Sequence, residues 1–106
     1  MAAELAHSEP DEQRLLAEVT AMLGHVTGED AQWLARVGLA SGLEGDLGLD
    51  SLEMAALGAL LRAAYGDRVD LPAFLAGLDI DQIIALTVGD LVGYVAAVGQ
   101  ATRAGR

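Results

Sequence analysis

Three short segments of this chain carry the pattern of a capped helix start, and together they restrict the fold more than any other feature. In residues 8–11, 50–53 and 87–90, a Ser, Asp or Thr is followed three residues later by Asp or Glu. The first side chain can accept a hydrogen bond from the backbone of a beginning helix, and the second can accept one in return. Apolar residues at helical spacing follow each start. The sequence therefore predicts an all-α fold.

The predicted helices can be placed along the chain. The first runs from Ser8 to about Leu23, the second from Ser51 to about Tyr65, and the last from Thr87 to about residue 98. A short helix after residues 27–30 includes Trp33, which we expect to anchor the following loop, and Gly66 ends the second long helix. Residues 38–49 form a long loop, residues 66–72 a turn, and residues 73–86 one or two short helices capped by Asp79 or Asp81.

The apolar residues of these segments predict the core. The expected inward-facing positions are Leu15, Leu16, Val19, Met22 and Leu23, then Leu52, Leu57, Leu60, Leu61 and Ala64, and finally Leu91, Val92, Val95 and Val98, with Leu39, Leu43, Leu47 and Leu49 pinning the loop. A chain of 106 residues favours a single domain. We expect its core to span about residues 9–98, with flexible ends at 1–7 and 99–106.

The charge and the residue types exclude several classes of function. Six arginines and no lysines face sixteen acidic residues, so clustered cations for nucleic acid are lacking. No cysteine is present, and no apolar run reaches the length of a membrane span. The start of the chain lacks a signal-peptide pattern. We expect a cytoplasmic, monomeric protein that meets basic protein surfaces.

Ser51 is the residue that points most directly to a function. Gly48 forms a turn, Asp50 caps the helix, and Ser51 follows at an exposed helix start beside Glu53. No histidine lies nearby in the sequence to activate the hydroxyl, and the surroundings are not those of a G-x-S-x-G hydrolase. The carboxylates of Asp46, Asp50 and Glu53 lack the spacing of a calcium loop. These residues indicate a serine that another enzyme modifies, without catalysis or a metal site of its own.

The run Asp46-Leu47-Gly48-Leu49-Asp50-Ser51-Leu52-Glu53-Met54 resembles the D-x-G-x-D-S-L motif of acyl carrier proteins. Glu44, Leu57, the Leu71-Pro72 step and the segment Thr87-Val88-Gly89-Asp90-Leu91-Val92-Gly93-Tyr94-Val95 also match patterns of that family. The resemblance implies a four-helix bundle with a long first loop and a short third helix. It also implies that Ser51 carries 4′-phosphopantetheine, which a phosphopantetheinyl transferase attaches from coenzyme A, and that the arm holds acyl groups as thioesters for loading, condensing or acyltransferase enzymes.

The chain departs from the family pattern in two places. The helix after Ser51, which carries many glutamates in fatty-acid carriers, is here rich in alanine. The expected partner-recognition residues are Asp50, Leu52, Glu53, Ala55, Ala56, Ala59 and Arg62. This nearly neutral face favours a specialised, polyketide-like pathway. The segment from Pro72 to Thr87 is also longer than in compact relatives, and it indicates either a thicker core or the lining of an acyl or partner site.

Two alternatives to a discrete acyl carrier remain open. An aminoacyl or peptidyl carrier would use the same arm on Ser51, although such carriers more often have G-G-H/D-S at this point. A helical interaction module with an incidental serine would use no arm at all. The cargo, the pathway and the partner enzymes are not specified by the sequence.

Overall fold

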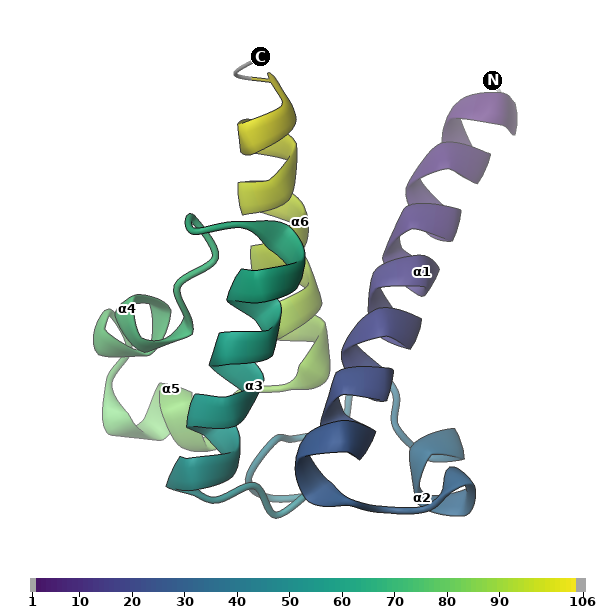
Figure 1. Ribbon diagram of the computed structural model, residues 1–106. Helices are drawn as coiled ribbons and strands as arrows, with labels where there is room; N and C mark the ends of the chain where they lie inside the picture. The colour runs from purple at the N-terminus through teal and green to yellow at the C-terminus, as the bar shows by residue number, and fades with distance from the viewer. Residues whose placement is uncertain (1, 105–106) are drawn as a thin grey trace.

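The computed structural model describes the backbone of residues 2–104 and the side chains of residues 12–98. Three long helices and three short ones make up this part of the chain, which contains no strand (Figure 1). They are α1 (Ala2–Thr27), α2 (Ala31–Ala35), α3 (Ser51–Tyr65), α4 (Leu71–Ala76), α5 (Ile80–Ile84) and α6 (Val88–Ala104). The all-α prediction is confirmed. Within residues 2–104, no helix is both long and apolar enough to cross a membrane.

The long helices α1, α3 and α6 enclose the core, and α3 and α6 both run in the opposite direction to α1 (Figure 1). Each contributes one apolar stripe, as the helical spacing predicts. The buried apolar side chains of these helices are Leu15, Val19 and Leu23 from α1, Leu57 and Leu61 from α3, and Val88, Leu91, Val92 and Val95 from α6. Fully burying such a side chain stabilises the fold by about 1.5–3 kcal/mol. The three long helices therefore supply most of the core. Along the chain, α2 lies between α1 and α3, and α4 and α5 lie between α3 and α6.

Helix α1 is longer than predicted at both ends. It begins at Ala2 rather than Ser8, because the residues before Ser8 include alanine, glutamate and leucine, which favour helix. It continues past Leu23 to Thr27, and Gly28 ends it with a φ of 73°. A Cβ on Gly24 would lie 3.0 Å from the side chain of Leu34, so this glycine permits close packing of α2 instead of ending the helix.

Some predictions fall outside the described side chains. Because α1 begins at Ala2, residues 8–11 lie inside it and the helix start predicted there is wrong, whereas the flexibility predicted at residues 1–7 and 99–106 stays a prediction.

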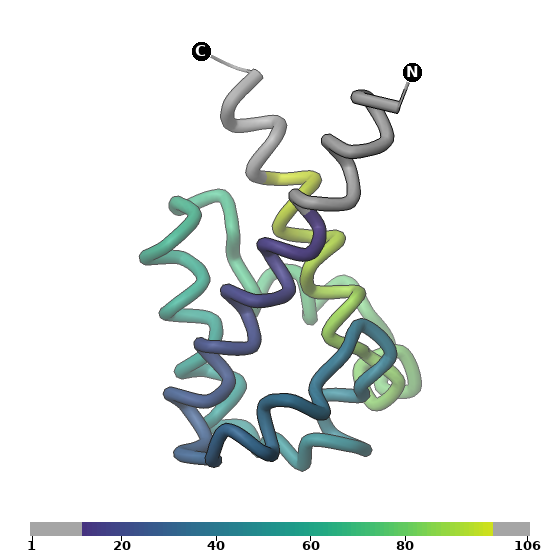
Figure 2. The backbone as a smooth tube through the Cα atoms, turned by 90° about the vertical axis from the view of Figure 1, so that its right-hand side faces the viewer, coloured from purple at the N-terminus to yellow at the C-terminus, as the bar shows by residue number. Residues whose placement is uncertain are grey.

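The loop between α2 and α3 is fixed to the start of α6. Leu43 is fully buried, and its backbone N–H donates to the carbonyl of Leu86 at 2.9 Å. Gly89 donates to the carbonyl of Leu39 at 2.8 Å, where a Cβ on Gly89 would lie 2.9 Å from that oxygen. The side chain of Leu39 is exposed, so the prediction that it pins the loop by burial is wrong. Leu39 holds the loop through its backbone carbonyl instead. Figure 2 shows the loop at the end of the molecule where α1 ends and α3 begins.

Two short helices connect α3 to α6. Asp70 caps α4 by accepting a hydrogen bond from the Ala73 N–H at 3.1 Å, and Pro72 lies in the first turn. The prediction of a turn over residues 66–72 is therefore wrong at its end. Proline is tolerated in the first turn of a helix because the N–H groups there have no carbonyl partner within the helix, so the missing N–H of proline costs nothing. Asp79 caps α5 as predicted, in a capping box with Gln82.

The apolar residues of this connection divide between the core and the surface. Phe74, Leu75 and Leu78 pack partly buried against the core, and Phe74 stacks on Tyr94 with ring centroids 4.4 Å apart. In contrast, Ile80 and Ile84 are 69% and 52% exposed, and α5 contains no buried residue. These two isoleucines therefore lie outside the core.

Candidate functional site

Ser51 is the first residue of α3, and the cap that holds it there is formed as predicted. The Asp50 carboxylate accepts a hydrogen bond from the Glu53 N–H at 2.8 Å, and the Glu53 carboxylate accepts one from the Asp50 N–H at 3.1 Å. These reciprocal bonds satisfy donors that a helix start would otherwise leave free. Ser51 is exposed. The cap therefore presents the serine at a fixed position on the surface.

The chain entering α3 is equally well fixed. Gly48 has a φ of 69°, which favours glycine, and its N–H donates to the carbonyl of Glu44 at 3.1 Å. Leu49 is buried next to it, and the Asp46 carboxylate accepts a hydrogen bond from the Gly42 N–H at 2.7 Å. The Asp and Gly positions of the motif thus shape the loop. Asp46 accepts a hydrogen bond from the backbone, and Gly48 gives the chain its turn.

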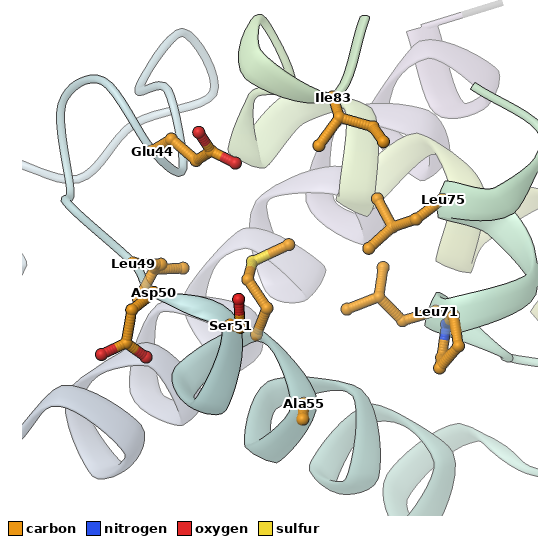
Figure 3. A pocket seen from close by; sticks show the side chains of 10 residues that line it. Glu44, Leu49, Asp50, Ser51, Ala55, Leu71, Leu75 and Ile83 are labelled. Atoms are coloured by element: carbon orange, nitrogen blue, oxygen red, sulfur yellow. The ribbon is translucent and has the colours of Figure 1, made fainter. Parts of the chain in front are cut away.

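A pocket of about 500 Å³ opens beside Ser51, and its walls come from α3 on one side and from α4 and α5 on the other (Figure 3). Leu71, Leu75 and Ile83 point into it, and the Asp50 carboxylate turns away. A volume of this size is typical of pockets that hold small organic groups. The lining residues are Glu44, Leu49, Asp50, Ser51, Met54, Ala55, Leu71, Pro72, Leu75 and Ile83. The serine therefore borders a largely apolar pocket.

The expected site residues divide into two groups. Asp50, Ser51 and Ala55 line the pocket together, whereas Ala56, Ala59 and Arg62 are exposed outside it. The Arg62 Nε lies 3.4 Å from the Asp67 carboxylate, so this positive charge is partly compensated. Glu53 is half-buried in the cap. The outer face of α3 is accordingly small in its side chains and nearly neutral.

Leu52 was predicted both in the core and among the partner-facing residues, and the core prediction is wrong. Its side chain is 81% exposed, whereas Leu57 and Leu61 are fully buried. Five helical positions separate Leu52 from Leu57, which turns it about 140° away from the buried stripe. Ala64, in the last turn, is exposed as well. A large apolar side chain is thus left in solvent directly beside the serine.

Most of the pocket lining was not identified from the sequence. Met54, Leu71, Leu75 and Ile83 reach the pocket because α4 and α5 fold back beside α3, a path that periodicity alone does not specify. One signal was available, since the surplus of apolar residues between Pro72 and Thr87 was larger than a small core needs. That surplus indicated an acyl or partner site as one of its two interpretations.

The polar surroundings of the Ser51 hydroxyl are sparse among the described residues. Among the described residues, the Ser51 hydroxyl has no hydrogen-bond partner that could take its proton. No histidine lines the pocket. Within residues 12–98, no group of three or more histidine, aspartate and glutamate side chains comes together in a way that could hold a metal ion. The arrangement can present a hydroxyl, and it offers an apolar surface next to that hydroxyl.

Comparisons with known protein families, with characterised proteins and with solved structures gave no match for this chain. The case for a function therefore depends on Ser51, its cap and its pocket.

Proposed function

We propose that the protein is a discrete acyl carrier protein that holds acyl intermediates on a 4′-phosphopantetheine arm attached to Ser51. The observation that carries the proposal is the placement of an exposed, unactivated serine on a rigid capped helix start, at the edge of an apolar pocket. A serine of this kind suits modification by a second enzyme better than catalysis. The D-x-G-x-D-S-L resemblance names that modification.

The chemistry needs little from the protein. A phosphopantetheinyl transferase with coenzyme A and magnesium would supply the activation that Ser51 lacks. The thiol of the arm would then hold the acyl group as a thioester, whose carbonyl carbon stays electrophilic. Tethering raises the effective concentration of the cargo for partner enzymes. In this proposal, Asp50 and Glu53 orient the helix start and have no catalytic role.

The proposal assigns each helix a place in a carrier-type four-helix bundle. The long helices α1, α3 and α6 correspond to the first, second and fourth helices, and α2 belongs to the long first loop. The short helices α4 and α5 together take the place of the third helix. Their apolar side chains beside Ser51 suit the apolar part of an acyl group.

The partner enzymes would meet the surface around Ser51. That surface includes Asp50, Leu52, Glu53, Ala55, Ala56, Ala59 and Arg62. Because the alanines and the compensated Arg62 give it little charge, a specialised, polyketide-like pathway suits it better than general fatty-acid synthesis. The same face is compatible with an aminoacyl or peptidyl carrier, and loading assays with adenylating enzymes would separate the two.

Intact-mass spectrometry tests the proposal. Incubation with coenzyme A and a broad-range phosphopantetheinyl transferase should add one phosphopantetheine to the chain. Ser51→Ala should remove the addition completely, and Ser41→Ala, a loop serine that serves as control, should preserve it. The proposal fails if the wild-type mass does not change, or if the Ser51→Ala chain still gains the arm.

A further inference from the structure

Helix α5 exposes more apolar surface than its packing accounts for. Ile80 and Ile84 lie one helical turn apart and are 69% and 52% exposed. Single apolar residues on a surface are ordinary, but two large ones on one turn of a five-residue helix without a buried residue are not. The helix holds its shape through the Asp79–Gln82 capping box. Its outward side chains therefore contribute little to the fold.

This apolar surface is continuous with the pocket beside Ser51. Ile83 lies about 60° around the helix from Ile80, and its side chain points into the pocket (Figure 3). A protein seated on Ile80 and Ile84 would stand next to the pocket whose opposite wall carries Ser51. The location suits an enzyme that acts on the serine.

The charge around α5 specifies the chemistry of that enzyme. Between Arg36 and Arg103 the sequence contains nine acidic residues and only two cationic ones, Arg62 and Arg68. Asp79 and Asp81 are exposed, and neither belongs to an ion pair among residues 12–98. An apolar surface flanked by carboxylates complements an apolar seat rimmed with arginine or lysine.

The opposite wall offers a weaker hold. The outer face of α3 exposes one large apolar side chain, Leu52 at 81%, and its exposed positions after Leu52 are mostly alanine. Alanine methyl groups cover little area, and Arg62 would repel a cationic enzyme. Apolar contact and charge therefore both favour α5 over the outer face of α3.

We propose that the phosphopantetheinyl transferase that modifies Ser51 docks on α5, with Ile80 and Ile84 in an apolar seat and with Asp79 and Asp81 facing its cationic rim. This inference rests on the proposed carrier function. In it, α3 presents the hydroxyl and α5 holds the enzyme.

Steady-state modification of the full chain by a broad-range transferase and coenzyme A tests the docking. Ile80→Ala with Ile84→Ala should lower kcat/KM by about tenfold, because both apolar contacts are truncated. Asp79→Asn with Asp81→Asn should lower it about threefold at low salt, and less at high salt because ions screen the attraction. Asparagine keeps the cap of α5, so this second pair changes charge without breaking the helix.

Matched variants control for general effects. Glu29→Gln with Asp30→Asn removes two charges from the start of α2, including an N-cap aspartate, and should change kcat/KM by less than about twofold. Leu39→Ala truncates an exposed leucine of the loop and should also have little effect. Circular dichroism would verify that each variant is folded.

The outcomes separate the docking from the carrier function. If the wild-type chain is modified and both α5 pairs retain its kcat/KM, the docking proposal is overturned and the carrier proposal stands. An equal loss in the α2 pair overturns the docking in favour of a general charge effect. If no phosphopantetheine is added to the wild-type chain, both proposals fail.

Discussion

Helices α3 and α5 begin with the same capping box, and each forms one wall of the pocket beside Ser51. In both, an aspartate accepts a hydrogen bond from the backbone three residues on, at 2.8 Å. The helices then differ. α3 continues for 15 residues and buries Leu57, Gly58 and Leu61, whereas α5 ends after five residues and buries none.

The difference between α3 and α5 shows that a helix cap and packing against the core contribute separately to the stability of a helix. A cap satisfies free N–H groups and sets where a helix begins, but short helices are marginal without tertiary packing. α3 has that packing from α1 and α4, and a Cβ on Gly58 would lie 3.2 Å from the Leu71 Cβ, so α4 approaches it closely. α5 depends largely on its cap. We therefore expect a rigid wall that presents Ser51 and a less stable wall opposite it.

Truncating one apolar residue in each wall should give the largest contrast. Leu57→Ala removes a fully buried side chain of α3 and should lower the free energy of unfolding by about 2–5 kcal/mol. Ile84→Ala removes an exposed one from α5 and should change it by less than about 0.5 kcal/mol. Urea unfolding followed by circular dichroism measures both. Similar losses in the two variants would mean that α5 belongs to the core after all.

The far end of α3 offers a smaller test of the same rigidity. The Tyr65 hydroxyl donates a hydrogen bond to the Glu18 carboxylate of α1. Burial and this hydrogen bond raise the pKa of Tyr65 above its ordinary value. Because Glu18 is partly exposed, we expect Tyr65→Phe to cost about 1 kcal/mol, which is less than is usual for a hydrogen bond to a charged group.

The raised pKa of Tyr65 also gives the effect a pH dependence. The folded state holds the phenol proton more tightly than the unfolded state, so the contribution is complete below the unfolded pKa of about 10 and is lost as the pH rises above it. The stability difference between wild type and Tyr65→Phe should therefore shrink between about pH 10 and about pH 12. A constant difference over that range would show that the hydrogen bond does not tie α3 to α1.

The sequence was most informative where local chemistry decides the structure. The caps at Asp50 and Thr87, the end of α3 at Gly66 and the buried Leu57 and Leu61 follow from side-chain type and helical spacing, and all were predicted. Ser51 was identified for the same reason, since the cap, the glycine turn and the missing base are local features.

The sequence was less informative where distant segments meet. The first long helix was predicted to end near Leu23, but Gly24 lies inside α1, where it allows Leu34 to pack closely. The pocket was missed because it forms only when α4 and α5 return beside α3. The exposure of Ile80 and Ile84 was missed because the number of apolar residues in a segment does not show which of them face the core.

Removing each cap should give the smallest effect and the most direct comparison of the two walls. Asp50→Ala should lower the free energy of unfolding by about 1 kcal/mol, because α3 unfolds together with the core that it packs against. Asp79→Ala should change global stability by less than about half of that amount, because α5 has no buried residue whose exposure would be coupled to its loss.

Hydrogen exchange in the native state would distinguish the two variants. Asp79→Ala should remove protection from the amides of Ile83 and Leu86, which donate to carbonyls within or next to α5, and leave those around Leu57 and Leu61 protected. Asp50→Asn and Asp79→Asn preserve the capping oxygen and should behave like wild type. Loss of protection across the core after Asp79→Ala would show that the two walls unfold as one unit, and the contrast between a packed and a capped helix would no longer hold.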